Sequence, residues 1–100
     1  MTQDRIPKSA RGEECQIRYV AGCNFDPATT CWAHSNSLAA GKGVGLKSLT
    51  LLGAYACSNC HDIYDGRRQR PEGMSLNDVR LGFYEGHERS LVILERKGLL

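Results

Sequence analysis

The chain has 100 residues, of which 41% are apolar and 24% are charged, a balance typical of one globular domain rather than a disordered chain. The net charge of +2 is too small to indicate nucleic-acid binding by itself, so the distribution of basic residues matters more than their sum. Neither a signal-peptide core nor a run of about 18 apolar residues is present, so we expect a cytoplasmic protein without a membrane anchor.

The first part of the chain predicts an arm followed by a turn-rich segment. Residues 1–9 are polar and show no hydrophobic period, so we expect a flexible N-terminal arm and a single domain over residues 10–100. Residues 15–23 favour a small hairpin, because Gly22 can turn the chain so that its two ends approach each other.

Two strands separated by a loop are expected in the middle of the chain. The β-branched and aromatic residues of 29–34 predict a strand that ends at His34. The small, glycine-rich residues of 35–45 predict a loop, and residues 46–56 predict a second strand.

Two helices are expected in the second half. The first follows Cys57 and extends to about Arg68, where proline and glycine interrupt the pattern. The second covers residues 76–97 and begins at a capping box formed by Ser75 and a residue three positions later. Two glycines inside it, at positions 82 and 86, cost the helix about 1 kcal/mol each relative to alanine, so we expect a bend or break near them.

Five cysteines in a chain without a secretion signal favour thiols and metal binding over disulfides. Cys57 and Cys60 have the C-x-x-C spacing that directs two sulfurs at one metal ion, and Cys15 and Cys23 offer a second pair. We therefore predict a closed four-thiolate structural zinc site. The alternative is that Cys15 and Cys23 are small buried apolar residues.

Cys31 and the remaining histidines leave the ligand set open. Cys31-x-x-His34 is also a plausible ligand spacing, although we prefer Cys31 as an ordinary strand residue. His87 is expected on the exposed side of the last helix, as a surface histidine.

Three residues carry possible catalytic chemistry. His61 and Asp65 lie four positions apart on an expected helix, so they share one face and could hold a second ion together. His34, at the end of a strand beside such an ion, could take a proton from water, because the pKa of histidine lies close to neutral. A purely structural role for His34 is the competing interpretation.

These motifs resemble the His-Asn-His (HNH) nucleases with the ββα-metal fold, and more closely the YbcO-type prophage nucleases. The central segment is also similar to a phage recombination-enhancement nuclease that acts with RecA. The resemblance rests on residues 10–12, Cys15, Cys23, the pair Ala33-His34, the run 57–62 and Asp65.

The resemblance implies an α+β fold: a small zinc-stabilised ββα-metal domain with an additional C-terminal helix. It implies a DNA endonuclease in which His34 is the general base. His61 and Asp65 would hold a catalytic Mg, Mn or Zn ion. Arg67, Arg68 and Lys42 would hold the DNA backbone, and RecA or another recombination protein is an expected partner.

Two departures from the family pattern favour a different function. Ala33 occupies the position of an expected acidic or histidine ligand, and the asparagine that orients the general base is replaced near Ser48. The alternative function is therefore a non-catalytic zinc-ribbon module that binds DNA or a recombination protein.

Overall fold

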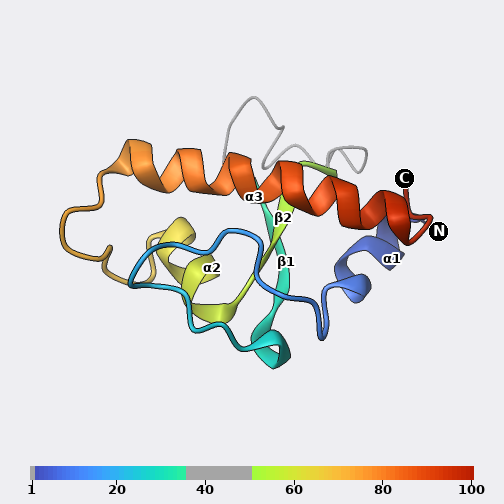
Figure 1. The fold of residues 1–100 in the computed structure, drawn as a ribbon, viewed down its shortest axis with the longest axis horizontal. Coiled ribbons are helices and arrows are strands. Elements are labelled where there is room, and N and C mark those ends of the chain that lie inside the picture. Colours follow the sequence, from blue (N-terminus) through green and yellow to red (C-terminus); the bar gives the residue numbers. More distant parts are fainter. Residues whose placement is uncertain (1, 36–50) are drawn as a thin grey trace.

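The computed structural model describes residues 2–35 and 51–100, arranged as a small two-stranded sheet with helices around it (Figure 1). The elements are α1 (Thr2–Ser9), a 3-10 helix η1 (Pro27–Thr29), β1 (Cys31–His34), β2 (Gly53–Ala56), α2 (Ser58–Asp65) and α3 (Leu76–Arg96). Lys42, Ser48 and the beginning of the expected second strand lie outside the described residues. In the part of the chain that the structure covers, no helix has both the length and the apolar character needed to cross a membrane.

The sheet and the helix that follows it form a strand, strand, helix unit. β1 and β2 are antiparallel, with Trp32 opposite Tyr55 and His34 opposite Gly53. β1 begins later than expected because Asp26 caps the preceding 3-10 turn by accepting a hydrogen bond from the Ala28 backbone. The α+β class is therefore as predicted, with shorter strands.

Helix α3 covers the outer edge of β2. The Tyr55 amide donates to Ser90 Oγ at 3.0 Å, and the Tyr55 carbonyl accepts from the Gln16 amide at 2.9 Å. The Gly53 carbonyl lies 2.7 Å from Nδ1 of His87. These contacts provide hydrogen-bond partners for backbone N–H and C=O groups of β2 that would otherwise be unpaired at the edge of the sheet. The expectation of a surface His87 was therefore wrong, because this side chain is half-buried against the strand.

The two glycines of α3 give neighbouring side chains room to approach, and they do not break the helix. A Cβ atom at Gly82 would lie 2.6 Å from Cε1 of Tyr19, and one at Gly86 would lie 2.8 Å from Cγ1 of Ile17. Both Tyr19 and Ile17 are buried, at 4% and 3% exposure. The predicted break was wrong, since the helix is continuous and the cost of the glycines is offset by this close packing.

Two segments differ from their expected local structure. Residues 15–23 contain turns and no strand, although their two ends do approach each other. Residues 2–9 form helix α1 where an irregular arm was expected. The reason is tertiary packing, because Ile6 is 1% exposed and belongs to a buried cluster with Trp32 and Leu94.

Replacing Ser90 tests how much the covered edge of β2 stabilises the fold. Ser90→Ala removes the acceptor of the buried Tyr55 amide, and an unsatisfied buried donor costs about 1–3 kcal/mol. We expect the free energy of unfolding, measured by urea denaturation, to fall by about that amount. Ser58→Ala, at an exposed serine, is the control and should change it by less than about 0.5 kcal/mol. Equal effects of the two changes would contradict the assignment.

Candidate metal centre

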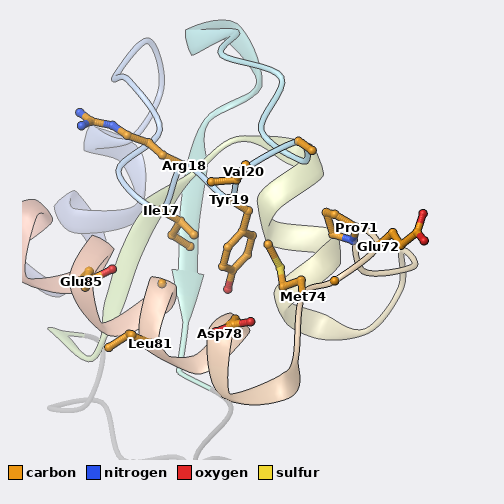
Figure 2. A pocket seen from close by; sticks show the side chains of 13 residues that line it. Ile17, Arg18, Tyr19, Val20, Pro71, Glu72, Met74, Asp78, Leu81 and Glu85 are labelled. Atoms are coloured by element: carbon orange, nitrogen blue, oxygen red, sulfur yellow. The ribbon is translucent and has the colours of Figure 1, made fainter.

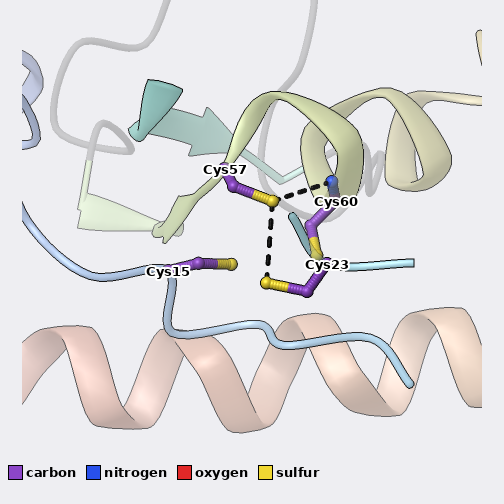
Figure 3. Close-up of side chains that lie close together, drawn as sticks. All are labelled: Cys15, Cys23, Cys57 and Cys60. Atoms are coloured by element: carbon purple, nitrogen blue, oxygen red, sulfur yellow. Dashed lines mark hydrogen bonds between the residues drawn. The ribbon is translucent and has the colours of Figure 1, made fainter. Parts of the chain in front are cut away.

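Four cysteines from two distant segments converge on one point (Figure 3). Cys15 and Cys23 come from the turns before the sheet, and Cys57 and Cys60 come from the start of α2. Their sulfur atoms all lie within 4.8 Å of one another, and Sγ of Cys57 is 3.7 Å from Sγ of Cys23. Tetrahedral zinc with bonds of about 2.3 Å would place its sulfurs about 3.8 Å apart. The four cysteines could therefore hold one metal ion with little rearrangement.

Backbone amides surround the sulfur cluster and favour its negative charge. The Arg18 amide donates to Sγ of Cys15 at 3.4 Å, and the Phe25 amide donates to Sγ of Cys23 at the same distance. The Cys60 amide donates to Sγ of Cys57 at 3.3 Å, which makes Cys57 the N-cap of α2. Such N–H groups stabilise thiolates and orient them toward an ion.

The thiols differ in how readily they lose their protons. A hydrogen bond from Cys60 lowers the pKa of Cys15 to about 5, and the same interaction raises the pKa of Cys60. Burial raises the pKa of Cys23 to about 12. Closely packed thiolates without a cation repel one another, so a divalent ion would displace the remaining protons and balance the charge. Soft thiolate donors in a closed set suit structural zinc.

A second group of titratable side chains lies on α2, next to the cysteines. Nε2 of His61 is 3.1 Å from Oδ2 of Asp65, and their side chains are 25% and 20% exposed. The spacing of four residues on one helix produces this contact, as the sequence predicted. Arg67 lies two residues beyond the end of the same helix, with Nη2 3.2 Å from Asp65 and 2.9 Å from Asp62.

Cys31 is a member of this second group that the sequence did not identify. Its Sγ lies 2.9 Å from Nδ1 of His61. Burial, followed by the charges of Asp62 and Asp65, raises the pKa of Cys31, so this thiol stays neutral. Because Cys31 and Asp65 contact opposite nitrogens of His61, the three side chains do not converge on one ion as they stand. The strand pairing explains this contact, since Cys31 lies opposite Ala56, two positions before α2 begins.

His34 lies exposed at the end of β1. Side chains alternate along a strand, so His34 shares a face with Trp32 and lies on the face opposite Cys31. The structure therefore brings His61 and Asp65 together and places His34 on the other face of β1. Because Cys31 and His34 lie on opposite faces of the strand, they are not placed to bind the same ion. Arg67 and Arg68 are both exposed.

Comparison with known proteins places this arrangement in a family. The sequence profile of the family described as "Putative nuclease YbcO" matches residues 4–99. The chain belongs to the YbcO family. Proteins named "Putative nuclease YbcO" from Escherichia coli K12 and "Putative nuclease ybcO" from Enterobacteria phage 82 are each 37% identical over 95 residues, covering 95% of both chains.

A solved structure supports the fold assignment for the YbcO-family chain. It is described as a putative bacteriophage protein from Escherichia coli K-12 substr. MG1655. It is 31% identical, with a TM-score of 0.72, and the match covers 93% of this chain and 99% of that chain. The family and both of these relatives carry the description "Putative nuclease".

Metal analysis tests the four-cysteine centre. We expect the purified protein to carry one tightly bound zinc ion, and Cys57→Ser or Cys60→Ser to lose the ion and unfold. Zinc binding in small domains contributes about 10–16 kcal/mol, which is comparable to the whole stability of a domain, about 5–15 kcal/mol. Elemental analysis and circular dichroism report the two effects. Cys31→Ser is the matched control and should keep zinc and fold, because Cys31 lies outside the cluster. A folded, cooperative wild-type protein without zinc would contradict the assignment.

Proposed function

We propose that this chain is a metal-dependent DNA endonuclease of the HNH-like ββα-metal type. The observation that supports this most directly is the contact of 3.1 Å between His61 and Asp65 on a helix that directly follows two antiparallel strands. The pair is partly exposed and offers one imidazole nitrogen and one carboxylate, donors that suit Mg, Mn or Zn. In this proposal the cysteine cluster holds a separate structural zinc and fixes the start of α2.

A divalent cation bound at the pair would stabilise the charge that develops on the scissile phosphate. The chain's own residues would do the remaining work. His61 and Asp65 would turn their donor atoms outward, and His34 would accept the proton of the attacking water. Because His34 shares a face with Trp32, the DNA phosphate would have to lie across the end of β1 to meet both His34 and the pair.

Arg67 and Arg68 would position the DNA backbone beside the pair. Arg67 is held by Asp62 and Asp65, so part of its charge is already balanced, whereas Arg68 is exposed. Lys42 remains a candidate phosphate contact. Phosphate contacts position a duplex without reading its sequence, so we expect weak sequence preference. RecA or another recombination protein stays a proposed partner.

A non-catalytic zinc module that binds DNA is the second candidate function. Its specific support is Ala33, which is fully buried beside β2 and offers no ligand, together with the placement of His34 on the face opposite Cys31 and His61. The two functions differ in one measurable respect, since the module binds DNA without cutting it.

Cleavage assays separate the two functions. With Mg, Mn or Zn added, we expect zinc-replete protein to nick plasmid DNA, and His61→Ala, Asp65→Ala and His34→Ala to lose the activity by about 100-fold or more. Each variant should keep the structural zinc and a near-normal melting temperature, because none of the three contributes a thiol to the cluster. Glu95→Gln, a change at an exposed carboxylate near the end of α3, is the control and should retain cleavage. If folded wild-type protein binds DNA but never nicks it, with or without RecA filaments, the binding module is correct.

The contact between Cys31 and His61 predicts a role in orienting the ligand. When Nδ1–H of His61 donates to the sulfur of Cys31, the lone pair lies on Nε2, so the thiol can hold the ring in the tautomer that binds an ion. We expect Cys31→Ala to weaken Mn²⁺ binding to zinc-replete protein by about 10–100-fold. Cys31→Ser should retain most of the affinity, because a hydroxyl also donates and accepts. Calorimetric titration measures this, and equal binding by Cys31→Ala would exclude the role.

The salt dependence of DNA binding tests the two arginines. Each phosphate neutralised on duplex DNA contributes about −0.9 to the slope of log K against log salt. We expect Arg68→Ala to reduce the slope by about one unit and Arg67→Ala by less, since Arg67 is paired with carboxylates. Arg96→Ala, an exposed arginine at the end of α3, should leave the slope unchanged. Equal slopes for all variants would show that DNA binds elsewhere.

A further inference from the structure

An apolar groove is lined in part by the segment that joins Cys15 to Cys23 (Figure 2). It has a volume of about 390 Å³ and lies between residues 17–21, the turn at 71–74 and the first half of α3. Tyr19, Met74 and Leu81 contribute apolar surface to it. The volume is near the lower end of that of small-molecule sites, so the groove fits a few side chains.

The walls of the groove expose apolar side chains to solvent. Val20 is 82% exposed and Leu81 is 59% exposed, and both line the groove. Exposed apolar side chains around a concave surface are characteristic of interaction sites. Neither the metal cluster nor the His61–Asp65 pair uses these two residues.

The shape of the groove is fixed before anything binds. The Tyr19 hydroxyl donates to the Val79 carbonyl at 2.6 Å, and Gly82 provides the space for the ring. Arg18 and Ala21, on either side of Val20, have positive φ angles of 57° and 61°. Residues 16–22 lie between two cysteines of the cluster, Cys15 and Cys23. Because the backbone around Val20 is already restricted, a partner that binds there has little further conformational entropy to remove.

The charges that line the groove are mainly negative. Glu72, Asp78 and Glu85 line it, and Arg18 is the one basic residue among its described lining residues. The Arg18 guanidinium is directed away, toward the Cys15 carbonyl at 3.0 Å and Oε1 of Gln16 at 3.3 Å (Figure 2). Asp78 caps α3, which leaves Glu72 and Glu85 as the carboxylates at opposite sides of the groove (Figure 2).

We propose that this groove binds a segment of a partner protein in which a bulky apolar side chain is flanked by lysine or arginine. The apolar side chain would lie among Val20, Tyr19 and Leu81, and the flanking cations would lie near Glu72 and Glu85. The carboxylates repel nucleic-acid phosphates, so the groove is separate from the proposed DNA-binding surface. This inference does not depend on nuclease activity.

Selection from a displayed library of random 12-residue peptides on the zinc-replete full chain tests the proposal. We expect enriched peptides to carry an apolar residue between basic ones. Synthetic versions of the enriched peptides should lose at least tenfold in affinity for Leu81→Asp and for Glu85→Lys. Val92→Asp and Glu95→Lys, exposed positions on the same helix outside the groove, are the matched controls and should bind as wild type does. Melting curves establish that all four variants are folded.

Several outcomes would overturn the proposal. They are the absence of an enriched sequence, enrichment of acidic peptides, and affinity that is unchanged by Leu81→Asp. Sedimentation that shows a wild-type dimer and a Leu81→Asp monomer would identify a second copy of the chain as the occupant. Weaker duplex DNA binding by Leu81→Asp, with Val92→Asp unaffected, would identify nucleic acid instead.

Discussion

The convergence of the four thiols is the constraint on which the rest of the structure depends. Each strand of the sheet has four residues, and so short a pair has little stability of its own. The cluster joins the turns at 15–23 to the first turn of α2, and these segments are more than 30 positions apart in the chain. A metal ion bound by both segments would close this long loop, and its binding free energy would offset the conformational entropy that the chain loses on folding.

Five consecutive residues transmit this constraint to the sheet and to α3. Cys15 belongs to the cluster, and the Gln16 amide pairs with the outer edge of β2. The Gln16 carbonyl accepts from Arg89 at 2.6 and 2.9 Å. Ile17 and Tyr19 then pack against the two glycines of α3. The same short segment therefore connects the cysteine cluster, the strand edge and the long helix, which explains why it forms turns and not the hairpin predicted for residues 15–23.

The parts of the fold that could be predicted are those that depend on local chemistry. The capping box of Ser75 and Asp78 fixed the start of α3, and the C-x-x-C spacing identified Cys57 and Cys60 as a pair. Apart from the late start of β1, which a local cap explains, the misses at α1 and His87 involve contacts between distant segments. Helix α1 forms because Ile6 is buried against the end of α3, and His87 is withdrawn from solvent by the Gly53 carbonyl. The sequence contains no local pattern for such contacts.

Cys31 shows how the same reasoning extends to the second site. Alone, Cys31 is a strand residue with an ambiguous spacing to His34. Once the strands are paired, Cys31 lies opposite Ala56, so its side chain reaches the first turn of the following helix. Because the cluster fixes that turn, the position of His61 is determined from two directions, by the thiols at the start of α2 and by Cys31 at its ring. Asp65 then contacts the other ring nitrogen of His61, Nε2. The His61–Asp65 pair, on a helix of eight residues, is thus held in one geometry without a large core, because the cysteine cluster and the paired strand each restrict it.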